Sequence, residues 1–170
     1  MRQRAVLAQV TLAGSLIFGI DTQANNHSGT QSVLTVDPNT GNFTTVFNGQ
    51  TLPNSFIDSG TNGLFFNDAN IPVCTNASFT NFYCPSGTLD LSGSLTGLNG
   101  VSATSAVVVD NAETLATNNP NFAVLPSLAG TYTSDTTTFD WGLPFYYGRR
   151  VATAIEAHTT AVNTGPYVAF

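Results

Sequence analysis

The chain has 170 residues, 42% of them hydrophobic and 8% charged, so it can bury one sizeable core and is not a disordered tail. A net charge of −6, with four basic residues in all, excludes the basic surface that nucleic-acid binding requires. Thirteen Ser, 25 Thr and 17 Asn make up about a third of the chain, and because sheet surfaces are often built from such residues, composition favours an all-β fold.

The first predicted elements lie in an apolar stretch, residues 11–22, which we expect to form two strands around a turn at residues 14–15. The basic start at residues 1–4 and the apolar run behind it also fit a signal peptide, and this alternative stays open. Polar residues interrupt the run, which is too short for a membrane-spanning helix. If the strands form, we expect the chain to be a fragment of a longer protein.

Strand and turn signals continue through the first half of the chain. Residues 37–41 hold Pro and Gly at positions typical of a turn. Asn48 and Gly49 form the strongest two-residue hairpin signal. Strands are expected at residues 31–36, 42–47, 50–58 and 64–66.

The second half repeats this pattern with one predicted helix. Residues 111–117 favour a short α-helix capped by Asp110 or Asn111. Residues 118–140 are polar and contain few apolar runs. Strands are expected at residues 88–97, 103–109 and 150–156, with an edge strand at 167–170. We find no repeat and no linker, so residues 1–170 are predicted to form one all-β domain of sandwich or barrel type.

The two cysteines, Cys74 and Cys84, lie ten positions apart in a loop-like stretch. Absent Lys, low charge and abundant Thr and Asn are typical of an exported β protein, in which the pair would form a disulfide. Two reduced thiols are the alternative. His27 and His158 stand alone in the sequence, so we expect neither a metal site nor a cofactor.

The segment SFIDSGTNGLFF, residues 55–66, carries the chemistry. Asp58 follows an apolar strand and precedes Ser-Gly, which puts its carboxylate on a tight turn. The hydroxyls of Ser59 and Thr61 and the N–H of Gly60 can donate hydrogen bonds to it. A plain Asp-Ser-Gly turn between two strands is the alternative.

Residues 56–66 resemble the active-site loop of pepsin-like aspartic peptidases, in which Asp-[Ser/Thr]-Gly-[Ser/Thr] joins two apolar strands. Trp141 and Gly142, with the segment FYYGRRVATAIE behind them, resemble the late part of a pepsin lobe, where an apolar-Gly pair lies beside the catalytic loop. The whole chain is similar to an uncharacterised bacterial family of two-lobed aspartic-peptidase relatives. The resemblance implies a single pepsin-type lobe, the second of two: a closed or partly open barrel with a short helix.

The sequence departs from the peptidase pattern at several positions. Asp140 stands where the peptidases have an apolar residue, and Leu143 where they often have Asp. No second Asp-[Ser/Thr]-Gly is present, because Asp21 is followed by Thr-Gln. The chain therefore offers one carboxylate, Asp58, to a reaction that needs two.

These features leave three interpretations of function. The chain is a lobe whose N-terminal mate is missing, or it pairs with a second copy of itself, or it is a non-catalytic secreted binding or surface module of the same fold. The first two imply an extended peptide substrate and an isolated chain with little activity. All three predict an extracytoplasmic protein, in the periplasm, at the cell surface or secreted, without a membrane span.

Overall fold

The structure is a computed structural model that describes residues 7–27, 29 and 31–170. It consists mostly of β-strands, with one short α-helix. The strands are β1 (Val33–Thr35), β2 (Phe43–Phe47), β3 (Gln50–Ile57), β4 (Leu64–Phe66), β5 (Leu89–Thr96), β6 (Ser102–Val109), β7 (Ala129–Gly130), β8 (Phe139–Trp141), β9 (Ala152–Ala154) and β10 (Tyr167–Ala169). The helices are α1 (Ala112–Asn118) and the 3-10 helices η1 (Ala24–Asn26), η2 (Ala77–Phe79) and η3 (Leu143–Tyr146).

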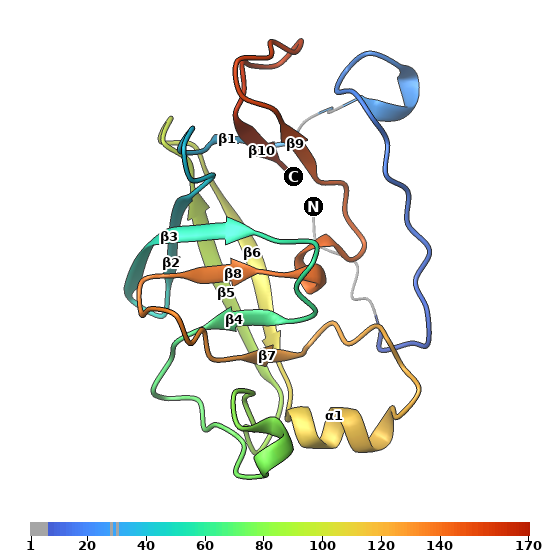
Figure 1. The fold of residues 1–170 in the computed structure, drawn as a ribbon, viewed down its shortest axis with the longest axis vertical. Helices are drawn as coiled ribbons and strands as arrows, with labels where there is room; N and C mark the ends of the chain where they lie inside the picture. The colour runs from blue at the N-terminus through green and yellow to red at the C-terminus, as the bar shows by residue number, and fades with distance from the viewer. Residues whose placement is uncertain (1–6, 28, 30) are drawn as a thin grey trace.

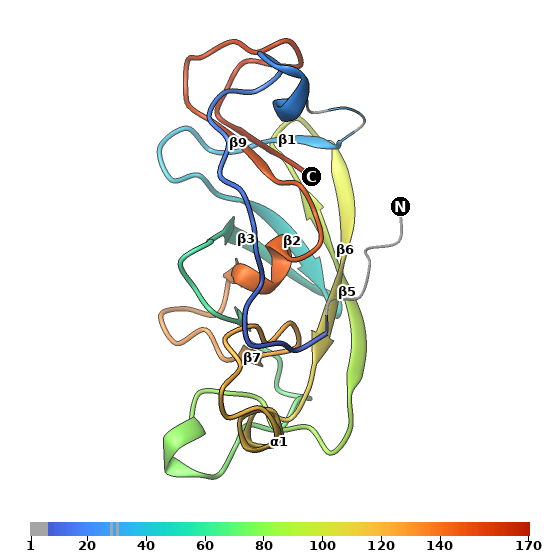
Figure 2. The same ribbon diagram turned by 90° about the vertical axis from the view of Figure 1, so that its right-hand side faces the viewer.

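Seven strands form one sheet in the order β6-β5-β2-β3-β8-β4-β7, which curls into a nearly closed, barrel-like layer. In Figure 1, β3, β8, β4 and β7 run across the view and β5 and β6 run upright behind them. Figure 2, turned by 90°, shows these two groups as separate layers. A second sheet of three strands, β1-β10-β9, lies at one end of the molecule.

Aromatic rings fill the space between the layers. Phe66 stacks on Phe139 with ring centroids 4.6 Å apart, and Phe139 stacks on Trp141 at 4.1 Å. The indole N–H of Trp141 donates to the hydroxyl of Thr45 at 3.0 Å, so the ring buries no unpaired donor. This stack fixes β4 and β8 against β2, and with them the loops at their ends.

The hairpin turns follow the predicted chemistry. Asn48 and Gly49 join β2 to β3 with φ of 46° and 77°, the left-handed values that a type I′ turn requires. Gly100 adopts φ of 76° in the turn between β5 and β6. Asn111 caps α1, because its side chain accepts from the N–H of Thr114 at 3.0 Å.

Three predictions of elements were wrong. Residues 11–22 form no strand: residues 11–18 run along one side of the molecule, and next to them Gln9 makes an isolated bridge to Val124. Residues 167–170 do not form an edge strand, since β10 lies between β1 and β9. The stretch 118–140 contains β7 and the start of β8, which were not predicted. The basic start of the signal-peptide alternative lies outside the described residues.

Candidate active site

Asp58 lies directly after β3, at the start of a loop that leads into β4. Its backbone N–H donates to the carbonyl of Trp141 at 3.0 Å, which extends the parallel pairing of β3 and β8 by one hydrogen bond. One carboxylate oxygen accepts from the N–H of Gly60 at 2.7 Å, and the other accepts from the Thr61 hydroxyl at 2.6 Å. Both oxygens are therefore held by the turn that follows them.

The segment Trp141-Gly142-Leu143 is locked against this loop. The N–H of Leu143 donates to the carbonyl of Thr61 at 2.7 Å. A Cβ at position 142 would lie 2.0 Å from the carbonyl oxygen of Gly63 and 2.8 Å from that of Thr61, so only Gly fits. The structure thus brings together the predicted residues Asp58, Gly60, Thr61, Trp141 and Gly142.

Asp140 is a second carboxyl group at this site, and the sequence did not mark it as a site residue. It pairs with Phe56 of β3 and Phe65 of β4, and side chains alternate along strands, so it lies on the same face of the sheet as Asp58. Its side chain is 5% exposed, and its Oδ1 is buried with no hydrogen-bond partner among the described residues.

The electrostatic setting of Asp140 favours its neutral form. Burial, and then the charge of Asp58, raise the pKa of Asp140 to about 7, while an interaction with the Thr61 hydroxyl lowers it. The sequence shows Asp140 between two aromatic residues, Phe139 and Trp141, but the short strand that buries it is evident only in the structure.

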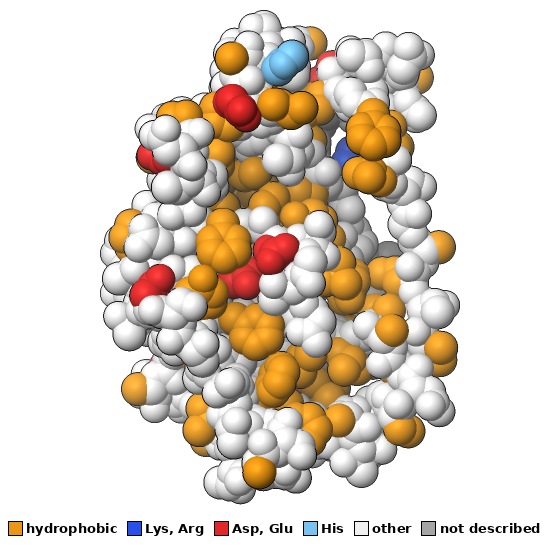
Figure 3. Space-filling view, viewed as in Figure 1, with side chains coloured by type: hydrophobic (Ala, Val, Ile, Leu, Met, Phe, Trp, Pro, Cys, Tyr) orange, Lys and Arg blue, Asp and Glu red, His pale blue; other side chains and the backbone are white. Residues whose placement is uncertain are grey.

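Tyr146 of η3 closes the site from another side. Burial, followed by the charges of Asp58 and Asp140, raises the pKa of Tyr146 to about 12, so its hydroxyl stays protonated. An interaction with the Ser59 side chain lowers the pKa of Tyr146, and the hydrogen bonds that hold Asp58 come from Gly60 and Thr61. Figure 3 shows acidic side chains in contact with one another near the middle of this face, framed by hydrophobic side chains.

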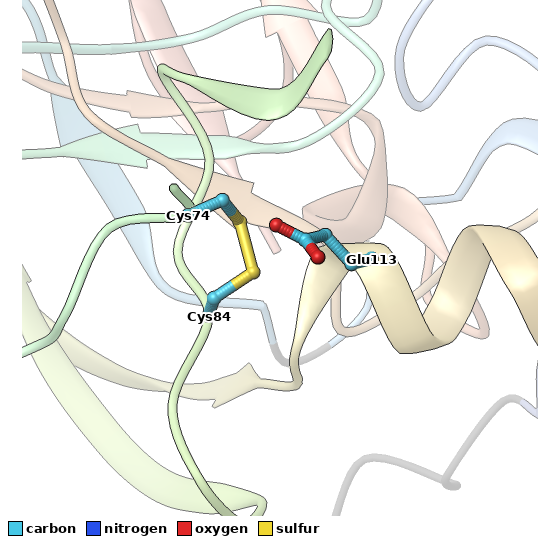
Figure 4. Close-up of side chains that lie close together, drawn as sticks. All are labelled: Cys74, Cys84 and Glu113. Atoms are coloured by element: carbon cyan, nitrogen blue, oxygen red, sulfur yellow. A yellow bond between two sulfur atoms is a disulfide. The ribbon is translucent and has the colours of Figure 1, made fainter. Parts of the chain in front are cut away.

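The predicted disulfide is confirmed. Cys74 and Cys84 are joined at 2.11 Å between the sulfurs, and the carboxylate of Glu113 on α1 points toward them (Figure 4). In the described part of the chain, these are the three side chains of metal-binding type that lie together. Because each sulfur is bonded to the other, the cluster offers no thiolate to a metal.

Comparison with known proteins gives a family and no activity. A family model described as "Protein of unknown function (DUF3443)" matches residues 1–170. A search of curated proteins and a search of solved structures each found no match. In the described residues, no helix has the length and apolar character to cross a membrane.

Proposed function

The chain belongs to the family described as protein of unknown function DUF3443, and on this premise we propose that it is an aspartic-peptidase-like lobe whose Asp58 supplies one carboxyl group of a peptide-hydrolysing site. One observation carries the proposal. Asp58 stands at the end of β3 with both oxygens held by the loop, and Trp141-Gly142 packs against that loop. This is the arrangement that the resemblance to a pepsin-type lobe implies, and the nearly closed sheet is compatible with such a lobe.

Peptide hydrolysis by this mechanism needs a base to take a proton from water and an acid to give one to the amide nitrogen. Two carboxyl groups a few ångströms apart perform both tasks, because they hold one proton between them. An extended peptide is the substrate class that the resemblance to a pepsin-type lobe implies. In this proposal Asp58 is the group that contacts the water.

The partner that completes the lobe is a companion N-terminal lobe or a second copy of this chain. Hydrophobic side chains on residues 7–18 support such an association, because Leu16 is 85% exposed and Phe18 is 88% exposed. The disulfide between Cys74 and Cys84 supports an extracytoplasmic location, where such bonds persist.

Cleavage of an unstructured protein at acid and neutral pH tests the proposal. We expect cleavage at acid pH that rises faster than linearly with the concentration of the chain if a second copy completes the site. Asp58→Asn should lower it by at least about 100-fold, because an amide neither takes nor gives the required proton. Asp37→Asn is the matched control: Asp37 also accepts turn hydrogen bonds, from the N–H groups of Asn39 and Thr40, in a turn elsewhere.

Cleavage that survives Asp58→Asn would remove the aspartic mechanism. Peptide binding without cleavage at any concentration would favour the other candidate, a non-catalytic binding module. The missing second Asp-[Ser/Thr]-Gly motif is the observation that favours this candidate.

A further inference from the structure

We propose that Asp58 and Asp140 form a carboxyl pair within one chain that holds a single proton, and that Asp140 is a positioning residue for Asp58. Its effect on catalysis rests on the proposed function, whereas the shared proton does not. The motif comparison gives this chain one catalytic-type carboxylate. The structure supplies a second one beside it, from the strand next to β3 in the sheet.

The strand pairing explains why the two groups meet. β8 lies between β3 and β4, and Asp140 stands in register with Phe56 on one side and Phe65 on the other. Asp58 is two residues beyond Phe56 and so returns to the same face. Asp140 therefore lies between two neighbouring strands and is 5% exposed.

The Thr61 hydroxyl can stabilise only one ionised carboxylate at a time. It has one hydrogen, which it donates to Asp58 Oδ2 at 2.6 Å. A hydrogen bond from the same hydroxyl to Asp140 would lower the pKa of Asp140, but this hydrogen is already used by Asp58. The buried Oδ1 of Asp140 then has no donor among the described residues, which favours the neutral form of Asp140.

Within residues 7–27, 29 and 31–170, Asp140 interacts with Asp58 and Thr61 from the loop and with Tyr146 from η3. None of these three groups carries a positive charge. Of the two described arginines, Arg149 lies over the ring of Phe145 at 4.3 Å, and Arg150 donates to the carbonyl of His27. The buried Oδ1 of Asp140, which lacks a partner among the described residues, is a place for the proton.

Titration of the aspartate side chains by carbon-13 NMR tests the pair in the whole chain. We expect one carboxyl signal to titrate near pH 7 and to be absent in Asp140→Asn. In Asp58→Asn that signal should move to lower pH, because the neighbouring charge is gone while burial remains. Asp58 is more exposed than Asp140, so this second variant keeps the test available if Asp140→Asn does not fold.

The proposal of a shared proton would be overturned if all aspartates titrated below about pH 5. It would also be overturned if the signal that titrates near pH 7 kept its midpoint in Asp58→Asn. The cleavage assay separates this result from the proposed function. If wild type cleaves the substrate, the cleavage rate should fall above about pH 7, and this fall should be absent in Asp140→Asn. If the variant and wild type have the same pH profile, Asp140 has no positioning role. If no cleavage occurs while the titration is as expected, the pair stands and the hydrolytic function fails.

Discussion

Asp140 and Asp68 show how two aspartates with the same exposure, 5% each, acquire opposite properties. Burial pushes the pKa of both carboxyl groups upward. At Asp68, hydrogen bonds from Asn48 and Asn70 outweigh burial, and the pKa is lowered. At Asp140, the nearby charge of Asp58 adds to burial, and the pKa rises to about 7. The partners of each side chain, rather than its depth, decide the direction.

The two aspartates should therefore give opposite pH dependences of stability. The pKa of Asp140 is higher in the folded chain than in the unfolded chain, so the folded chain loses stability as the pH rises from about 4 to about 7. Over this range the equilibrium constant of unfolding should increase by up to about tenfold per pH unit. Asp140→Asn should remove this loss, so the variant should become more stable relative to wild type as the pH rises. The stabilisation by ionised Asp68 is present above its unfolded pKa and is lost as the pH falls through its lowered folded pKa. Asp68→Asn should therefore be most destabilised at neutral pH.

Urea unfolding of both variants from pH 4 to pH 8 checks these signs. If the free energy of unfolding changes with pH in the same way for wild type and for Asp140→Asn, the first expectation is contradicted. A destabilisation of Asp68→Asn that grows on acidification would contradict the second.

The hydroxyl of Tyr83 provides a further prediction for a single residue. It donates to the carbonyl of Phe66 at 2.6 Å and accepts from the N–H of Asp68 at 2.9 Å, and all three groups are buried. Tyr83→Phe leaves two backbone groups without partners and should lower the free energy of unfolding by about 1–3 kcal/mol. Tyr132→Phe, in a half-buried ring, should change it by less than about 0.5 kcal/mol. Equal effects in thermal unfolding would contradict this account.

Among the secondary-structure elements, the disulfide and helix α1 form a unit outside the main sheet. Cys74 packs with Ala112 of α1 and Leu128, and Glu113 accepts from the N–H of Asn76 at 3.3 Å. The bond closes a loop of ten positions. Replacing both cysteines by Ala should therefore destabilise the fold by about 3 kcal/mol, chiefly by releasing the unfolded chain.

Chemical denaturation of wild type, with and without reductant, provides the control for the cysteine variant. Reduced wild type and the double variant should unfold at similar denaturant concentrations. A double variant as stable as the oxidised protein would show that the disulfide contributes little to the stability of the fold.

Elements were predictable from the sequence where local chemistry decides them. Alternation and the Asn-Gly turns located β2, β3, β5 and β6 to within a few residues, and Asn111 identified the start of α1. β7 and β8 have two and three residues and depend on partners far along the chain, so no local pattern indicated them. Residues 11–22 are apolar enough for a strand, but among the described residues they pair with no strand.

The candidate site was likewise predictable only where local sequence decides the structure. The motif located Asp58, Gly60 and Thr61, because a turn is local. Asp140 was missed because its role depends on the register of β8 between β3 and β4, which no short segment determines.

At the scale of the whole molecule, the segment of residues 7–27 lies along the side of the fold and leaves apolar side chains open to solvent (Figures 1 and 3). A cavity of about 390 Å³, lined in part by Leu7, Leu115 and Phe145, lies between its start and the core. Residues 10–19 are all exposed, so the apolar side chains among them are available to another chain.

The isolated chain should accordingly self-associate. Light scattering is expected to give a mass that rises with concentration, and replacing Leu16 and Phe18 by Ser should suppress the rise because it removes the most exposed apolar groups. Leu98→Ser, at a residue 63% exposed beyond the end of β5, is the control and should leave the rise intact. A wild-type chain that stays monomeric at all concentrations would argue against docking through this segment.

The parallel pairing of β3 with β8 also sets the order of events while the chain is made. Ser55 and Phe139, which are hydrogen-bonded in the folded protein, are 84 residues apart, so a ribosome adding about 5–20 residues per second exposes the first roughly 4 to 17 seconds before the second. The β5–β6 hairpin closes locally and needs no such wait. In refolding followed by hydrogen exchange, the amide of Asp58 should gain protection after those of β5 and β6, and earlier protection would contradict this order. A nascent chain thus holds Asp58 without its neighbour Asp140 until β8 has been made, so topology alone delays the meeting of the two carboxyl groups.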